Sequence, residues 1–110
     1  MTTSYPSWLG LEPLLDELTS QQRELLESAR TRIDSDLPKD THVMEQVFAE
    51  MIKVDRKTLK NDRTPSGPGR YPVAIRYGGS RLVSYLRHDV VDWLAYQQMR
   101  ARMRRIHRCR

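Results

Sequence analysis

Four polar side chains crowd one short stretch near the middle of the chain: Arg56, Lys57, Lys60 and Asn61. At helical spacing they point away from Leu59, the one strong apolar residue among them. Arg and Asn form paired hydrogen bonds with guanine and adenine edges, whereas Lys more often holds phosphate. A short helix with one buried anchor suits a DNA groove better than a protein core. We therefore expect these residues to contact DNA, with a solvated basic face as the alternative.

Other basic residues extend this candidate DNA-binding set beyond that helix. They are Arg63 at its end, Arg76 and Arg81 in the segment 73–85, and Arg100, Arg102, Arg104 and Arg105 in the C-terminal tail. Arg76 and Arg81 are expected to anchor a β-hairpin on DNA, and the tail to follow the DNA backbone without base preference. Surface charge without a ligand is the alternative for the hairpin, and disorder without function is the alternative for the tail.

The charge is distributed unevenly along the chain. Residues 1–50 hold 4 Lys/Arg and 10 Asp/Glu, a net −6, whereas residues 51–110 hold 15 and 4, a net +11, which together give the formal +5. Such a field attracts a polyanion to the second half of the chain and repels it from the first.

Enzymatic and metal chemistry find no support in the residue pattern. The single cysteine, Cys109, excludes an internal disulfide, and His42, His88 and His107 are scattered without zinc-ligand spacing. No catalytic Ser/His/Asp or Cys/His grouping is present, and no cofactor is expected. We find no signal-peptide pattern and no apolar run of roughly 20 residues, so we expect a cytoplasmic protein that does not enter membranes.

The first part of the chain is expected to be an acidic helical hairpin over residues 11–33. Leucines at helical spacing predict its first helix, and Thr19 with Gln22 predicts a capping box before a second helix, Gln21 to Ile33. Residues 34–40 are expected to be a linker because they are polar and contain Pro38. The hairpin's apolar surface must be covered by the rest of the chain, a second copy or a partner.

A second set of elements follows from Thr41. Thr41 is expected to cap a helix that ends before a turn at residues 52–54, and Asp55 to cap the basic helix 55–62. Residues 64–70 form a loop, the alternation in 73–85 predicts a β-hairpin with Gly78-Gly79 at its turn, and a last helix begins near Asp89. The expected core is Val47, Phe48, Leu59, Val73, Ile75, Val83, Tyr85, Trp93 and Leu94.

These elements predict a mainly α fold with a small β-hairpin: a winged helix-turn-helix preceded by an N-terminal helical hairpin. We divide the chain into residues 1–40 (acidic hairpin and linker), 41–96 (winged helix-turn-helix) and 97–110 (helix extension and basic tail). A helix-turn-helix followed by a wing is an arrangement that reads duplex DNA.

The chain also resembles the excisionase-like, MerR-related winged-helix family over about half its length. The matching residues are Val54-Asp-Arg-Lys-Thr-Leu59, then Pro72, Gly78-Gly79, Val83-Ser-Tyr85 and Asp89-Val-Val-Asp-Trp-Leu94. Two features depart from the family pattern. Asp55 replaces the usual Ser, and the aromatic residue often found at the end of the recognition helix is absent.

The resemblance implies a recognition helix in the major groove and a wing on the backbone or minor groove. It also implies a phage or mobile-element role in transcription regulation or in excision and DNA recombination, with an integrase or the transcription machinery as a possible partner. From the residues themselves, a homodimer or tandem oligomer on double-stranded DNA is expected to raise specificity. The competing class is a protein-interaction module in which the acidic hairpin binds another regulator.

Overall fold

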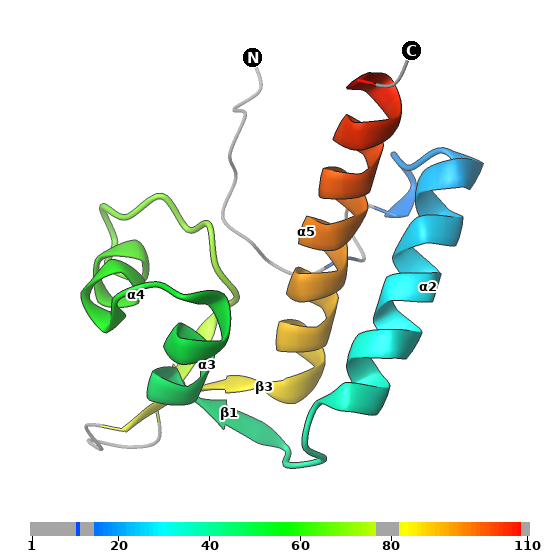
Figure 1. Cartoon of the computed structure of the whole chain (residues 1–110). Helices are drawn as coiled ribbons and strands as arrows, with labels where there is room; N and C mark the ends of the chain where they lie inside the picture. The colour runs from blue at the N-terminus through cyan, green and yellow to red at the C-terminus, as the bar shows by residue number, and fades with distance from the viewer. Residues whose placement is uncertain (1–10, 12–14, 77–81, 109–110) are drawn as a thin grey trace. The chain divides into compact units, whose positions relative to one another are not determined.

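A computed structural model of the chain describes Leu11, residues 15–76 and residues 82–108, with side chains through Ile106. Within these residues the fold is mainly helical, as predicted, with a small antiparallel sheet. The elements in chain order are α2 (Ser20–Asp36), β1 (His42–Met44), α3 (Glu45–Ile52), α4 (Arg56–Asp62), β2 (Ala74–Arg76), β3 (Val83–Leu86) and α5 (Arg87–Arg108) (Figure 1). No helix in the described ranges is long and apolar enough to cross a membrane.

The chain divides into two compact units. The described part of the first, here called the sheet unit, comprises residues 40–76 and 82–90. The described part of the second, the helical unit, comprises Leu11, residues 15–39 and residues 91–108.

In the sheet unit, three strands rather than the predicted two-stranded hairpin form the sheet. Their order is β1-β3-β2, with Val43 opposite Tyr85 and Ala74 also opposite Tyr85. The expectation that Thr41 caps a helix is wrong, because residues 42–44 are a strand and the helix begins at Glu45. β-Branched Val43 is buried between two more exposed neighbours, which is the alternation of a strand.

The expected core places Val73, Ile75, Val83 and Tyr85 together on one face of the hairpin, and the sheet register corrects this expectation. Residues directly opposite one another in an antiparallel pair lie on the same face. Ala74 and Arg76 therefore share the face of Tyr85 and Val83, while Ile75 pairs with Ser84 on the other face. A shift of one position in the assumed register is enough to exchange the two faces.

The core of the sheet unit confirms part of the predicted set. Phe48, Leu59, Val83 and Tyr85 are buried, and the rings of Phe48 and Tyr85 lie 4.9 Å apart. The predictions for Val47 and Val73 are wrong, because both are about half exposed (50% and 51%). Val47 lies off the buried side of α3, and Val73 precedes β2 by one residue. Ile75 is only partly buried.

In the helical unit, α2 confirms the predicted capping box. The Thr19 N–H donates to Gln22 Oε1 at 2.8 Å, and the Gln22 N–H donates to Thr19 Oγ1 at 3.2 Å. The helix continues past Ile33 to Asp36, so the linker starts later than predicted. Leu37 ends it in an extended conformation, as expected for a residue that precedes proline. Of the predicted first helix of the hairpin, residues 12–14 lie outside the described ranges; across them, the Leu15 N–H donates to the Leu11 carbonyl at 3.1 Å.

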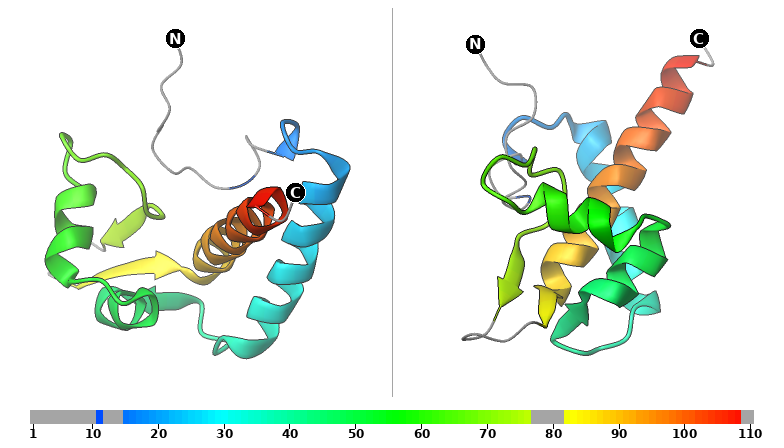
Figure 2. Two further views of the ribbon diagram at one scale, coloured as in Figure 1. Left: turned by 45° about the horizontal axis from the view of Figure 1, so that its top comes forward. Right: turned by 90° about the vertical axis from the view of Figure 1, so that its left-hand side faces the viewer.

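Helix α5 covers the apolar side of α2. It begins at Arg87, two residues before the predicted start, and lies beside α2 in Figure 1 and in the left-hand view of Figure 2. Buried residues of this unit come from both helices: Leu26, Ala29 and Ile33 from α2, and Val91, Trp93, Ala95 and Met99 from α5. Arg30 Nε lies 3.0 Å from Asp92 Oδ1. Leu94 of the predicted core is only partly buried.

Candidate nucleic-acid interface

The turn before α4 sets the direction of this helix, and it forms as predicted. α3 ends at Ile52, and Lys53 adopts a left-handed conformation (φ 61°, ψ 40°). The Val54 N–H donates to the Ala49 carbonyl at 3.0 Å, which closes the end of α3. Asp55 is the N-cap of α4, and its carboxylate accepts from the Lys57 N–H at 3.2 Å.

α4 buries one side and exposes a basic one. Leu59 is 1% exposed and anchors the helix, while Arg56, Lys57, Lys60 and Asn61 are all exposed. This is the arrangement that the sequence predicts for them. Residues 51–76 carry seven Lys/Arg and two Asp/Glu. Those two acidic residues are Asp55, which caps α4, and Asp62, which is buried. The charge presented outward by this segment is therefore mainly positive.

Asp62 holds the loop that follows α4. Its Oδ1 accepts from the Arg70 N–H at 2.7 Å and its Oδ2 from the Tyr71 N–H at 3.2 Å. The sequence pattern predicts Asp62 only as the last residue of the basic helix. One signal was present: an acidic residue at a helix C-terminus is disfavoured by the helix dipole, so it needs another partner.

Glycine is required inside this loop for reasons of space. A Cβ at Gly67 would lie 2.3 Å from the carbonyl oxygens of both Asn61 and Asp62. Gly69 adopts a positive φ of 64°, which glycine tolerates better than other residues. Together with the Asp62 hydrogen bonds, these contacts fix the path from α4 to β2.

A second buried carboxylate, Glu45, ties α4 to the sheet. Glu45 is 4% exposed and forms an ion pair with Arg63 at the C-cap of α4. It also accepts from the Tyr85 hydroxyl at 3.3 Å, and Arg56 Nε lies 3.9 Å from its other oxygen. One carboxylate thus faces cations from both ends of α4. Arg63, predicted to contact DNA, is directed toward Glu45, and no residue near Arg63 in the sequence indicates this pairing.

The environment of Tyr85 favours its neutral form. Burial, followed by the charge of Glu45 and the hydrogen bond to it, raises the pKa of Tyr85 well above its ordinary value. The hydroxyl therefore remains a hydrogen-bond donor to Glu45 at neutral pH.

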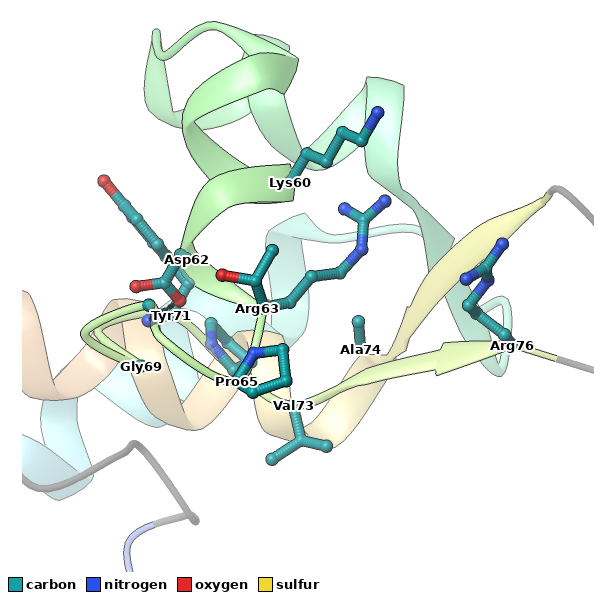
Figure 3. A pocket seen from close by; sticks show the side chains of 12 residues that line it. Lys60, Asp62, Arg63, Pro65, Gly69, Tyr71, Val73, Ala74 and Arg76 are labelled. Carbon is teal, nitrogen blue, oxygen red and sulfur yellow. Dashed lines mark hydrogen bonds between the residues drawn. The ribbon is translucent and has the colours of Figure 1, made fainter.

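A pocket of about 630 Å³ lies between the end of α4, the following loop and β2 (Figure 3). Its basic lining residues are Lys60, Arg63 and Arg76, and its apolar ones include Pro65, Pro72, Val73 and Ala74. In Figure 3 the side chains of Lys60 and Arg63 extend toward the side of the pocket where Arg76 stands on β2. The loop that Asp62 holds forms the remaining wall.

The candidate residues are divided between the two units. Arg56, Lys57, Lys60, Asn61, Arg63 and Arg76 belong to the sheet unit, and Arg81 lies outside the described residues. Arg100, Arg102, Arg104 and Arg105 belong to α5 in the helical unit, where all four are exposed. The Arg100 guanidinium lies 5.7 Å from the centre of the Tyr96 ring, within cation–π range.

Comparison of the chain with protein-family models, with curated proteins and with solved structures yields no match.

Proposed function

We propose that the protein binds double-stranded DNA in a sequence-specific manner through the sheet unit. In this proposal α3, the turn at Lys53–Asp55 and α4 act as a helix-turn-helix, and β2 with β3 acts as the wing. α4 is the recognition helix and enters the major groove, while the wing lies on the backbone or minor groove.

The observation that carries the proposal is the composition of the exposed face of α4. Arg56, Lys57, Lys60 and Asn61 are exposed, while Asp55 and Asp62 are engaged by backbone N–H groups. A short helix with a basic outer face is the electrostatic footprint expected of a DNA reader. An α-helix with its side chains is roughly 10–12 Å in diameter. This diameter matches the width of the major groove, about 12 Å.

The exposed residues of α4 receive different roles in this proposal. Arg56 and Asn61 read base edges, because their side chains form paired hydrogen bonds with guanine and adenine. Lys57 and Lys60 neutralise phosphates. Arg63 is assigned a positioning role, since its guanidinium pairs with the buried Glu45.

The resemblance to excisionase-like proteins supports a biological setting for this activity. We infer a transcription regulator or an excision and recombination directionality factor of a phage or mobile element. An integrase or the transcription machinery is the partner class that such a role would require.

Salt-dependent binding to duplex DNA tests the proposal. Fluorescence anisotropy with a labelled random-sequence duplex, repeated between 50 and 200 mM salt, is the measurement. With about six phosphate contacts, affinity should fall on the order of a thousandfold over that range. A selection from random duplexes should then yield a preferred site. Binding that is absent at low salt, or that does not change with salt, would favour a protein-interaction module instead.

A further inference from the structure

Two basic side chains that line the pocket between α4 and β2, those of Lys60 and Arg76, remain available to a ligand. Arg63 is engaged by Glu45, and the only carboxylate among the pocket-lining residues, Asp62, accepts hydrogen bonds from two backbone N–H groups. In the described part of the chain, neither Lys60 nor Arg76 has a carboxylate partner. Both side chains are exposed. The pocket therefore presents two positive charges, from two different elements, to one space.

An apolar surface lies beside these cations. Ala74 lines the pocket and lies on the same face of β2 as Arg76, whereas the Val73 side chain points to the opposite side of β2 (Figure 3). Pro65 is exposed and lines the same pocket. A ligand that suits this lining carries more than one negative charge, separated by an apolar group.

One strand of a DNA backbone has this chemistry, because neighbouring phosphates are joined through a deoxyribose whose carbon atoms are apolar. We propose that the pocket holds a segment of one sugar–phosphate strand. Lys60 and Arg76 each hold one of two adjacent phosphates, and the deoxyribose between them packs on Ala74 and Pro65. This proposal rests on the DNA-binding function above and identifies the part of the protein surface that binds the DNA backbone.

The walls of the pocket are held in place before any ligand arrives. Asp62 binds the backbone of Arg70 and Tyr71, and Gly67 packs against the last carbonyls of α4. Arg76 shares the face of Val83 and Tyr85, and the Tyr85 hydroxyl donates to Glu45 of α3, so Arg76 lies on the α3 side of the sheet. A preformed binding surface lowers the entropic cost of ordering side chains and loops when a ligand binds.

The salt dependence of binding to a random-sequence duplex tests the two phosphate contacts. Each phosphate contact contributes roughly 0.9 to the slope of log affinity against log salt concentration. Lys60→Ala and Arg76→Ala should each lower the slope by about that amount, and the double variant by about twice as much. Lys39→Ala is the charge-matched control: it removes one exposed positive charge from the helical unit and should leave the slope unchanged.

Pro65→Ala tests the sugar contact, because it removes part of an exposed apolar ring from the pocket lining without a change in charge. It should weaken binding roughly fourfold, as for the loss of one methylene-sized apolar contact, with the wild-type slope. Thermal melts should confirm that all variants fold.

Two results would overturn the proposal while DNA binding itself remained intact. One is a double variant of Lys60 and Arg76 with the slope of the Lys39→Ala control. The other is Pro65→Ala with wild-type affinity. If the wild-type protein fails to bind duplex DNA at all, the proposed function falls and the pocket proposal with it, so the two failures are distinguishable.

Discussion

Arg63, at the C-cap of α4, is ion-paired with Glu45, the first residue of α3. Glu45 is almost completely buried, and the Arg63 side chain is 24% exposed. The pair therefore links the two helices through a carboxylate that is shielded from bulk water. It also fixes the position of the exposed basic face of α4 relative to the sheet, because Glu45 bonds to Tyr85 on β3 as well.

Removal of one partner from this pair should destabilise the protein strongly. Arg63→Ala leaves the Glu45 carboxylate buried without its main partner, so we expect a loss of about 3 kcal/mol in the free energy of unfolding. Arg56→Ala is the matched comparison, because Arg56 lies 3.9 Å from the same carboxylate but is 61% exposed. It should cost less than about 1 kcal/mol. Urea unfolding measures both, and equal losses would contradict the assigned roles.

The loop after α4 should not tolerate a side chain at Gly67. Gly67→Ala would place a methyl carbon 2.3 Å from two backbone carbonyl oxygens. We expect a loss of roughly 1–3 kcal/mol, because the α4 backbone must move to make room. Ser66→Ala, at the exposed neighbouring position, should change stability by less than about 0.5 kcal/mol. Thermal melts that rank the two variants equally would refute the close approach.

Local signals explain which parts of this interface could be predicted from sequence. Three of these signals lie in or next to α4: the N-cap Asp55, the single strong apolar residue Leu59 and the Gly/Pro loop. Each of them affects only residues that are close to it in the sequence. The alternation of Val83 and Tyr85 likewise depends only on the strand that carries them. These features are visible without any knowledge of tertiary contacts.

The missed features depend on partners that are distant in the sequence. β1 forms because Val43 pairs with Tyr85 on a strand after the loop, which a local helix pattern cannot reveal. The direction of Arg63 depends on Glu45 in another helix. The face of Arg76 depends on the β2–β3 register, and the sequence alternation leaves that register open by one residue.

Alkaline pH should destabilise the protein through Tyr85. Its pKa in the folded state is raised above the ordinary value of about 10, first by burial and then by Glu45. Because this pKa is raised in the folded state, Tyr85 contributes its full stabilisation below pH 10, and this contribution is lost as the pH rises above 10. Tyr85→Phe should cost about 1 kcal/mol at pH 7, through the lost hydrogen bond.

The difference in stability between wild type and Tyr85→Phe should shrink as the pH rises above 10, because only the wild type loses the Tyr85 contribution. Urea unfolding of both proteins at pH 7 and at pH values up to the limit of reversible folding provides the comparison. A constant difference would show that Tyr85 ionises as freely in the folded protein as in the unfolded chain.

Glycine in place of Lys53, the left-handed residue between α3 and α4, should not lower the stability of the protein. A left-handed conformation costs an L-residue roughly 1–2 kcal/mol, and glycine escapes most of this cost while losing more entropy on folding. Lys53→Gly should therefore raise stability by about 0.5 kcal/mol or leave it unchanged. Lys53→Val should lower it, because β-branched residues are outliers at positive φ. Greater stability of the valine variant would be incompatible with the observed φ of 61°.

The basic helix and the C-terminal arginines should contribute differently to DNA binding. Asn61 is exposed on α4 and pairs naturally with adenine, so Asn61→Ala should cost roughly 1–3 kcal/mol at the preferred site and relax base preference there. Arg102, Arg104 and Arg105 are exposed on α5, with no acidic residue after Asp92 in the sequence. Their replacement by Gln should weaken preferred and random duplexes equally and reduce the salt slope. Competition between a selected site and random DNA separates these effects. The division would be refuted if the Gln variant lost discrimination between the two duplexes while Asn61→Ala lowered affinity for both alike.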